Sequence, residues 1–331
     1  MDYNELLKAF STLTAYQQRT ISMAIIDALE LNEEDRNNRP KICPFCQKET
    51  RTIKKGFRCR KQRYQCKNCK HIFTYNSHTI TQHSKIEPSM FRKIVLDTLS
   101  CIPIRQTAAT LNLSSTCVFQ NRHKILCALE VLLDEEQQKL CGTIEFDETF
   151  ELESKKGERN ITRKARKRGG SSDYRGLSRE QMCIVTTTDR DGHEIFKCVG
   201  FGKPTASSIV ECFKKNIVEH SIIYCDGATC YNELGKETNC NVVHLKSHQE
   251  YNIVEHINTV NYIHTLIKKQ LCAFKGVSTK YINRYCSLFV FIRRFQNMAD
   301  NELLPIILRK LKNLKFSITR NKLSTSRIFG K

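Results

Sequence analysis

The sequence predicts an α/β protein in which a mixed sheet with packed helices follows two smaller modules. Three observations lead to this prediction. From residue 142 onward, apolar runs typical of strands alternate with helical patterns in the order βββαβ(α)βα. Two Cys-x-x-Cys pairs lie between residues 41 and 75, and residues 86–140 have a helical apolar period. At 331 residues the chain is long enough for two or three domains.

The charge of the chain indicates a polyanionic partner. It has 54 Lys and Arg against 34 Asp and Glu, a formal net charge of +20. Because the phosphates of a nucleic acid are bound by many distributed cations, nucleic acid is the expected partner. The alternative is a protein whose basic surface has no such partner. No apolar run approaches the roughly 20 residues of a membrane span, and the N-terminus does not resemble a signal peptide. We therefore expect a cytoplasmic protein with no membrane partner, whose 17 cysteines are mostly reduced.

Residues 1–38 are predicted to be a helical segment. Apolar residues recur with a helical period up to residue 29, and the period is interrupted near Thr14, where the sequence TAYQ fits a capping box. Two short amphipathic helices are therefore expected. The polar run that follows has no periodicity and ends in Pro40, which indicates a linker.

Two cysteine pairs predict a zinc ribbon over residues 39–80. Cys43 and Cys46 are separated from Cys66 and Cys69 by 19 residues, a spacing that lets two hairpin turns present four thiolates to Zn²⁺. The alternatives are unrelated thiols or a redox pair, and Cys59 is not expected to be a ligand. The hairpin between the pairs is cationic and interleaved with aromatic residues, so it suits phosphates. Its expected nucleic-acid contacts are Arg58, Arg60, Lys61 and Arg63.

Residues 86–140 contain a predicted helix-turn-helix. One helix runs from about Ile104 to Leu111 and breaks at Asn112, and a second begins after Ser114, a favourable N-cap. The side chains expected to face a major groove are Ser115, Thr116, Gln120 and Arg122. A helical hairpin without a role in DNA binding is the alternative.

The acidic residues of the apolar stretch IEFDETF, residues 144–150, require an explanation. Asp147 lies in a predicted strand, where a carboxylate is costly to bury unless it is paired or binds a metal. A second predicted strand, residues 221–225, ends in Asp226 just before a glycine. If the strands are neighbours, the two carboxylates converge in an arrangement that suits Mg²⁺. The alternative is a strand-end cap and a solvated Asp-Gly turn.

A helix predicted over residues 257–273 carries a polar face toward these acids. Its members follow i, i+3, i+7 and i+10 spacing and are Asn258, Asn261, Thr265 and Lys268. The residues expected nearer the other face are Ile257, Val260, His264 and Ile267.

These features together resemble the zinc-ribbon DDE transposases of bacterial insertion sequences, in the group related to Merlin elements. The resemblance covers residues 40–295 and rests on the ribbon, RQTAATLNLSSTCVFQNRHKIL, DET, YCDGATCY, and HINTVNYIHTLIKKQL followed by GVSTKYINRY. It implies an RNase H-like domain over residues 141–300, with the first and fourth strands adjacent and Asp147 and Asp226 as ligands of Mg²⁺ or Mn²⁺. Asn261 falls where most relatives carry a final Glu. A branch of the family is similar in having Asn there and a Lys seven residues later, here Lys268.

The resemblance implies a DNA transposase that binds terminal inverted repeats and catalyses metal-dependent strand cleavage and transfer. A homo-oligomer on DNA is expected, because two element ends must be brought together, and the bacterial nucleoid is the expected location. If Asn261 is not the third ligand, Glu255 is the nearest acid, and Lys268 either contacts a phosphate or is a plain surface lysine. The alternative functions are an inactive or domesticated DNA-binding regulator and an RNase H-like nuclease.

Two basic segments complete the prediction. A loop between Asp147 and the next strand is expected to order on DNA, with a disordered solvated insert as the alternative. Its expected DNA contacts are Arg163, Lys164, Arg166, Lys167 and Arg168. Residues 301–331 are predicted to form a basic helical tail.

Overall fold

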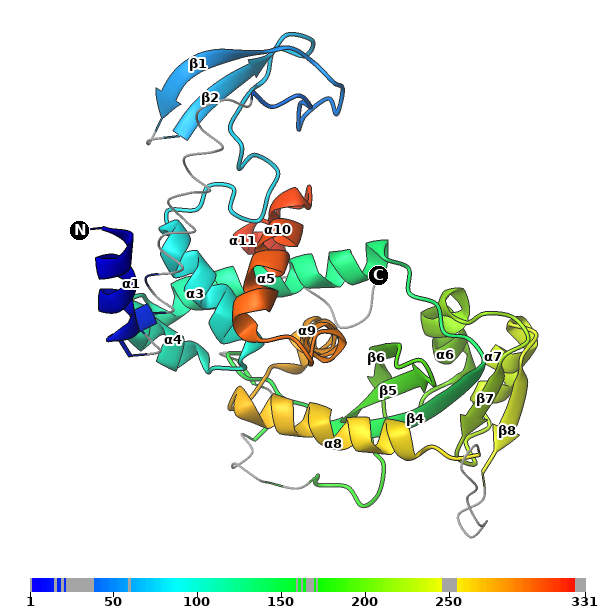
Figure 1. Ribbon diagram of the computed structural model, residues 1–331. Helices are drawn as coiled ribbons and strands as arrows, with labels where there is room; N and C mark the ends of the chain where they lie inside the picture. Colours follow the sequence, from blue (N-terminus) through cyan, green and yellow to red (C-terminus); the bar gives the residue numbers. More distant parts are fainter. Residues whose placement is uncertain are drawn as a thin grey trace. The chain divides into compact units, whose positions relative to one another are not determined.

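The computed structural model describes residues 2–14, 17–18, 21, 39–58, 61–158, 160–161, 163–164, 170, 172–245 and 255–324 (Figure 1). The chain divides into two compact units. The first comprises residues 1–98 and 298–318, and the second residues 99–297 and 319–331. Among the helices in the described part of the chain, none combines the length and the apolar character that crossing a bilayer requires.

The first unit begins with helix α1 (Tyr3–Ser11), which a capping box starts. Asp2 accepts from the Glu5 backbone N–H at 2.8 Å, and Glu5 accepts in return from the Asp2 N–H at 3.0 Å. The same reciprocal bonding joins Thr14 and Gln17, at 3.0 and 3.3 Å, as TAYQ predicts. Most of the second helix predicted for this segment lies outside the described residues.

A small antiparallel sheet of order β1-β2-β3 follows, from strands β1 (Thr52–Arg58), β2 (Lys61–Cys66) and β3 (Ile72–Phe73). β2 alternates buried and more exposed residues, because Tyr64 packs on Phe73 and Tyr75 while the cationic side chains point outward. Gly56, with φ of +71°, lies within the register shift of β1, a bulge conformation that glycine adopts without strain.

Two helices complete this unit, α3 (Pro88–Leu99), which ends at the unit boundary, and α10 (Asp300–Asn313). α3 begins at Pro88. Proline is favourable at the first position of a helix, because the backbone N–H that it lacks would have no acceptor within the helix there. α10 and the short α11 (Arg320–Ser324), which belongs to the second unit, are the helices in the described part of the tail, and residues 314–319 between them are not helical.

The second unit opens with two helices joined by a tight turn, α4 (Ile104–Leu111) and α5 (Ser115–Glu135). Asn112 ends α4 in the left-handed conformation, with φ of 51°. The Ser114 hydroxyl accepts from the Cys117 backbone N–H at 3.2 Å and so caps α5. The predicted bounds of α4 and the predicted cap of α5 are both as observed.

The centre of the second unit is a mixed five-stranded sheet of order β6-β5-β4-β7-β8. Its strands are β4 (Thr143–Leu152), β5 (Gln181–Asp189), β6 (Glu194–Phe201), β7 (Ile222–Cys225) and β8 (Asn241–His244). β4, β5 and β6 pair antiparallel, whereas β7 pairs parallel to both β4 and β8. The predicted mixed sheet, with its first and fourth strands adjacent, is therefore confirmed.

Helices cover this sheet, and two hydrophobic clusters show which residues face which helices (Figure 1). Ile144 and Phe146 of β4 pack in a cluster with residues of α6 (Ala206–Phe213) and α7 (Tyr231–Glu237). Residues of β5 and β6 pack in a second cluster with α8 (Asn258–Ala273) and α9 (Ile282–Arg294). Because side chains alternate along a strand, Glu145 and Asp147 lie on the face of β4 opposite to Ile144 and Phe146, and both contact residues of the α8 segment.

Candidate active site and metal-binding residues

The two strands that carry the predicted aspartates bring them to one point. The parallel register pairs Phe146 of β4 with Cys225 of β7, and the next residue on each strand is Asp147 or Asp226. One ligand oxygen from each of Asp147, Glu148 and Asp226 lies within 4.8 Å of the other two. Asp226 is exposed and directly follows β7, where its carboxylate accepts from the Ala228 backbone N–H at 3.1 Å.

Glu148 is the member of this group that sequence reasoning missed. It follows Asp147 on the same strand, and strand alternation alone would direct the two side chains to opposite faces. The Tyr231 hydroxyl of α7 donates to Glu148 Oε1 at 2.8 Å, and the Cys230 thiol donates to the same oxygen at 3.8 Å. The only sequence signal for Glu148 was that it directly follows Asp147 in DET. Its contact with α7 is what holds its carboxylate near the other two acids.

Proximity and burial change the protonation of these acids. Burial, with the charges of Glu148 and Asp226 adding to it, raises the pKa of Asp147 to about 7. Burial also raises the pKa of Glu148, with Asp226 adding to the effect. Carboxylates this close repel one another, and a bound divalent cation removes that cost by supplying opposite charge. The donor set, three hard oxygen ligands beside an exposed strand end, fits Mg²⁺ or Mn²⁺.

His264 of α8 is buried on the same side of the helix as Val260 and Ile267, as predicted, and from there it contacts the first of these acids. Its Nδ1 lies 3.5 Å from Asp147 Oδ2, and the residue is 7% exposed. Burial lowers the pKa of His264 to about 4, with the charge of Lys268 adding to the effect, so the imidazole is neutral at pH 7. Position 264 lies one turn beyond Asn261 and belongs to the buried residues of α8, so it meets β4.

Asn261 and Lys268 are both exposed residues of α8. They share a helical face with His264, at i, i+3 and i+7. The Asn261 amide nitrogen donates to the Ile257 backbone oxygen at 3.0 Å, which leaves the amide oxygen as the atom able to bind a cation. The positive charge of Lys268 partly opposes the burial that raises the pKa of Asp147 and of Glu151. Glu255 is exposed and precedes the helix.

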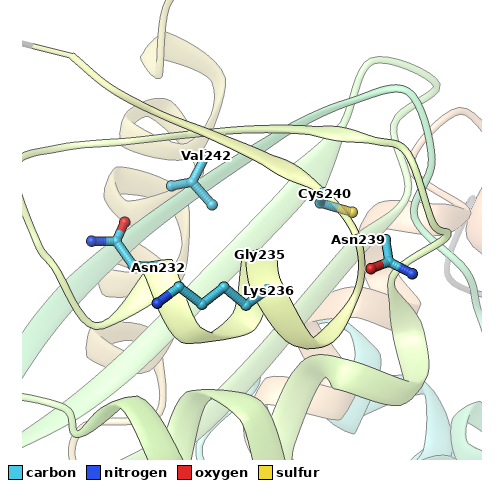
Figure 2. Close-up of a pocket in the computed structure, with 6 residues that line it drawn as sticks. All are labelled: Asn232, Gly235, Lys236, Asn239, Cys240 and Val242. Atoms are coloured by element: carbon cyan, nitrogen blue, oxygen red, sulfur yellow. The ribbon is translucent and has the colours of Figure 1, made fainter.

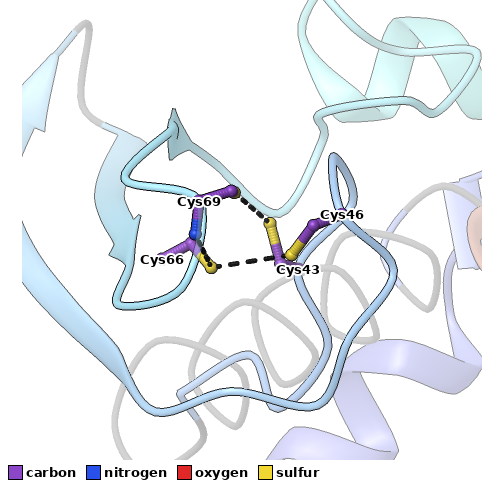
Figure 3. A group of neighbouring side chains, drawn as sticks. All are labelled: Cys43, Cys46, Cys66 and Cys69. Atoms are coloured by element: carbon purple, nitrogen blue, oxygen red, sulfur yellow. Dashed lines mark hydrogen bonds between the residues drawn. The ribbon is translucent and has the colours of Figure 1, made fainter.

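The four predicted zinc ligands form a second metal-competent group, in the first unit (Figure 3). Cys43 Sγ lies 3.6 Å from Cys69 Sγ, and Cys46 Sγ lies 3.8 Å from Cys66 Sγ. A tetrahedral Zn²⁺ with Zn–S bonds of about 2.3 Å places its sulfurs about 3.8 Å apart. The Cys69 backbone N–H also donates to Cys66 Sγ at 3.4 Å, a bond that favours the thiolate. The geometry therefore fits a structural zinc ion.

The residues predicted to bind DNA have different environments. Arg58, Lys61, Ser115, Thr116 and Lys164 are exposed, and Arg63 and Gln120 are partly exposed. Arg163 is partly buried, with its Nε 3.8 Å from a Glu153 carboxylate oxygen. Arg60, Arg166, Lys167 and Arg168 lie outside the described residues.

Arg122 does not face a groove, and that prediction was wrong. The residue is 0% exposed, with its guanidinium 5.5 Å from the Phe274 ring centre and 3.4 Å from the Thr107 hydroxyl. The cause is tertiary, because α5 packs against both α4 and α9 and therefore buries a wider face than a surface helix would.

A surface pocket elsewhere on the sheet edge does not coincide with the acids. It is lined by Asn232, Gly235, Lys236, Asn239, Cys240 and Val242, from α7 through the start of β8 (Figure 2). Gly235 explains the close approach of α7 to β8, because a Cβ there would lie 2.4 Å from a Val242 methyl. None of the six residues is acidic, so the carboxylates define the candidate site.

Residues 139–295 match the ISXO2-like transposase domain family. This match contains the whole sheet and the three acids. A protein of Halobacterium salinarum (strain ATCC 700922 / JCM 11081 / NRC-1), described as an uncharacterized protein in transposable element ISH50, is 28% identical over 276 residues. That alignment covers 80% of this chain and 90% of the relative. Together these likenesses support an insertion-sequence transposase.

Solved structures with a similar arrangement include a simian T-cell lymphotropic virus intasome in complex with PP2A regulatory subunit B56 gamma. It is 10% identical, with a TM-score of 0.28, and the similarity covers 60% of this chain and 65% of that chain. A pre-cleavage Mos1 transpososome is 12% identical, with a TM-score of 0.23, and covers 67% of this chain and 78% of its own. The mixed five-stranded sheet and the match to an ISXO2-like domain support an RNase H-like catalytic domain.

Proposed function

We propose that this protein is the DNA transposase of an insertion sequence, which binds the terminal inverted repeats of its element and catalyses strand cleavage and strand transfer. The observation that carries the proposal is the meeting of Asp147, Glu148 and Asp226 within 4.8 Å, inside the ISXO2-like domain. Three carboxylates at one strand end are otherwise costly, because each raises the free energy of ionising the next. Their placement is explained if they hold cations.

In this proposal Asp147 and Asp226 bind two divalent cations, Mg²⁺ or Mn²⁺, with Glu148 as a third carboxylate and Asn261 as a neutral oxygen donor. When bound, such cations activate the attacking oxygen and stabilise the leaving 3′-oxygen of an in-line phosphoryl transfer. An amide at position 261 brings no charge, so the Glu148 carboxylate supplies what a final Glu on α8 would otherwise provide.

The remaining residues of the site orient Asp147 and the DNA. His264 is neutral and lies 3.5 Å from Asp147 Oδ2, so it restricts that carboxylate without adding a positive charge. Lys268 is exposed on the same face of α8, and we assign its ammonium to a contact with a DNA phosphate beside the acids. If Lys268 is instead a plain surface lysine, neutralising its charge should not change the rate of strand cleavage.

DNA recognition is assigned to the zinc ribbon and to the α4–α5 pair. The thiol geometry supports a Zn²⁺ that stabilises the ribbon, and the cationic side chains Arg58 and Lys61 are exposed on its strands. At the start of α5, Ser115 and Thr116 are exposed and able to reach base edges. We place the protein at the nucleoid as a homo-oligomer, because two element ends must be joined in one complex.

The test is Asp147→Asn in the full-length protein, with a labelled element end and Mg²⁺. We expect the rate of strand cleavage to fall by about a thousandfold or more, because a ligand charge is lost where the reaction develops negative charge. Affinity for the DNA end should remain within about twofold, because phosphate contacts from the ribbon and α5 do not involve the acids.

Glu219→Gln is the matched control, since Glu219 is an exposed acid that belongs to none of the groups of possible metal ligands among the described residues. This control should leave the rate of strand cleavage and the affinity for the DNA end unchanged. Lost binding with unaltered cleavage in Asp147→Asn would contradict the proposal. Cleavage that persists when the end sequence is scrambled would instead indicate an RNase H-like nuclease, and a wild-type protein that binds ends without metal-dependent strand transfer would indicate a regulator.

A further inference from the structure

A second buried acid on β4 binds the first turn of α8. Glu145 is 1% exposed and lies two residues before Asp147, on the same face of the strand. Its Oε2 accepts from the Val260 backbone N–H at 3.0 Å. Val260 is the third residue of α8, and Ile257 at the N-cap position provides no side-chain hydrogen bond. A distant carboxylate therefore does what a local Ser or Asp does at other helix starts.

Arg190 links the same carboxylate to the chain leading into α8. It follows β5, forms an ion pair with Glu145, and donates from its guanidinium to the Thr259 hydroxyl at 3.3 Å and to the His256 backbone oxygen at 3.4 Å. His256 Nδ1 lies 3.4 Å from Glu145 Oε1. Three segments that are distant in sequence, β4, the turn after β5 and the start of α8, thus meet around one ion pair, in which Glu145 is buried and Arg190 is exposed.

We propose that Glu145 and Arg190 form a clamp that fixes the start of α8 on β4 and so positions Asn261, the residue after Val260, beside the acids. A carboxylate at a helix N-terminus is favoured by the helix dipole, and a buried carboxylate such as Glu145 is costly unless it keeps its hydrogen-bond and ionic partners. Glu145 and Asp147 are separated by about 6.6 Å of rigid strand, so the clamp sets how far along β4 the helix begins. Both are positioning residues, and their effect on catalysis rests on the proposed function.

The first test measures the clamp without any assay of activity. Amide hydrogen exchange at Val260 should be slow in the wild type, although first-turn amides have no acceptor within their helix. Glu145→Ala should accelerate exchange at Val260 at least tenfold, and Glu145→Gln, which keeps an acceptor oxygen, should give an intermediate value. Unchanged exchange in Glu145→Ala would overturn the proposal.

The second test measures the consequence for the site. Mn²⁺ affinity should fall about tenfold or more in Glu145→Ala, as expected when a residue supporting a metal ligand is lost. The cleavage rate at saturating DNA should fall with it, while affinity for the DNA end stays unchanged. The control is Glu194→Ala, which breaks a comparable buried ion pair between β6 and Arg293 of α9 and should alter neither Val260 exchange nor Mn²⁺ affinity.

The outcomes separate the clamp from the proposed function. If the wild type cleaves no DNA, the proposed function fails while exchange at Val260 still decides the clamp. If the wild type cleaves and Glu145→Ala loses Val260 protection without any loss of Mn²⁺ affinity or rate, the positioning role fails. If Glu145→Ala loses protection from amide exchange throughout the chain, the milder single variants Arg190→Gln and Glu145→Gln are each compared with the wild type instead. Val260 exchange that is the same in both variants as in the wild type would overturn the clamp.

Discussion

Removal of the Tyr231 hydroxyl isolates the role of Glu148. Tyr231 is 0% exposed, and its ring packs 5.2 Å from the ring of Phe146. Tyr231→Phe keeps that packing and deletes only the oxygen that donates to Glu148 Oε1 at 2.8 Å. A hydrogen bond to a charged acceptor contributes about 1.5–3 kcal/mol. We expect the free energy of unfolding to fall by that amount, because Glu148 keeps only the weaker thiol donor, Cys230.

The same change should weaken the metal site if Glu148 is a ligand. Loss of a hydrogen bond that orients a ligating carboxylate typically lowers metal affinity about 10–100-fold. Mn²⁺ affinity is measured by titration of the free ion, and stability by urea unfolding with zinc retained. We expect both to fall in Tyr231→Phe, and the Mg²⁺ concentration needed for half-maximal cleavage to rise in parallel.

Tyr285→Phe is the matched control, because Tyr285 of α9 is 6% exposed and packs on His123 and Phe274 rather than on the acids. It should leave Mn²⁺ affinity unchanged. If Tyr231→Phe loses stability but binds Mn²⁺ as tightly as the wild type, Glu148 is a structural partner of Tyr231, and our assignment of it as a third carboxylate ligand is refuted.

Three further predictions concern separate parts of the chain. Asn261→Ala should lower the cleavage rate at least about tenfold through lost metal affinity; an unaffected rate, with Glu255→Gln impaired instead, would transfer the third ligand to Glu255. Cys66→Ser should abolish stoichiometric zinc binding and unfold the ribbon, seen by zinc release and loss of end binding, and zinc retained at full occupancy would contradict this. Burial lowers the pKa of His123 to about 3, so the unfolded state binds more protons between about pH 6.5 and 3 and stability falls on acidification there. His123→Gln should reduce that slope by up to about 1.4 kcal/mol per pH unit in urea unfolding, and an unchanged slope would show that His123 titrates normally.

Local signals accounted for the elements of the fold. Asn112 and Ser114 placed the turn between α4 and α5, because one tolerates the left-handed conformation and the other caps a helix with its own side chain. Apolar patterning predicted the order of strands and helices from residue 142 onward, and the strand predicted over residues 221–225 is observed as β7 (Ile222–Cys225). Such signals depend on a few neighbouring residues, so they can be recognised from the sequence alone.

The surroundings of individual side chains were harder to predict from the sequence. Arg122 was expected on a DNA-facing surface and is buried, because α9, from a distant part of the chain, packs on α5 together with the neighbouring α4. His264 was expected on the apolar side of α8 and is buried there with Val260 and Ile267, but its contact with Asp147 was not predicted, because the sheet beneath α8 decides which strand residue that side meets. Neither outcome follows from helical spacing alone, which says which residues share a face but not what that face meets.

The sequence by itself determined the order of strands and helices, the cysteine pairs that suit zinc and the two aspartates that end up together, since residue identity and spacing encode backbone conformation and ligand chemistry. Only the tertiary structure decided that Glu148 joins Asp147 and Asp226 and that Glu145 is bound at the start of α8. Those contacts span from 78 to 115 positions of sequence. They exist because burial makes an unpartnered carboxylate costly, and the partner that relieves the cost is supplied by whichever segment folding brings near.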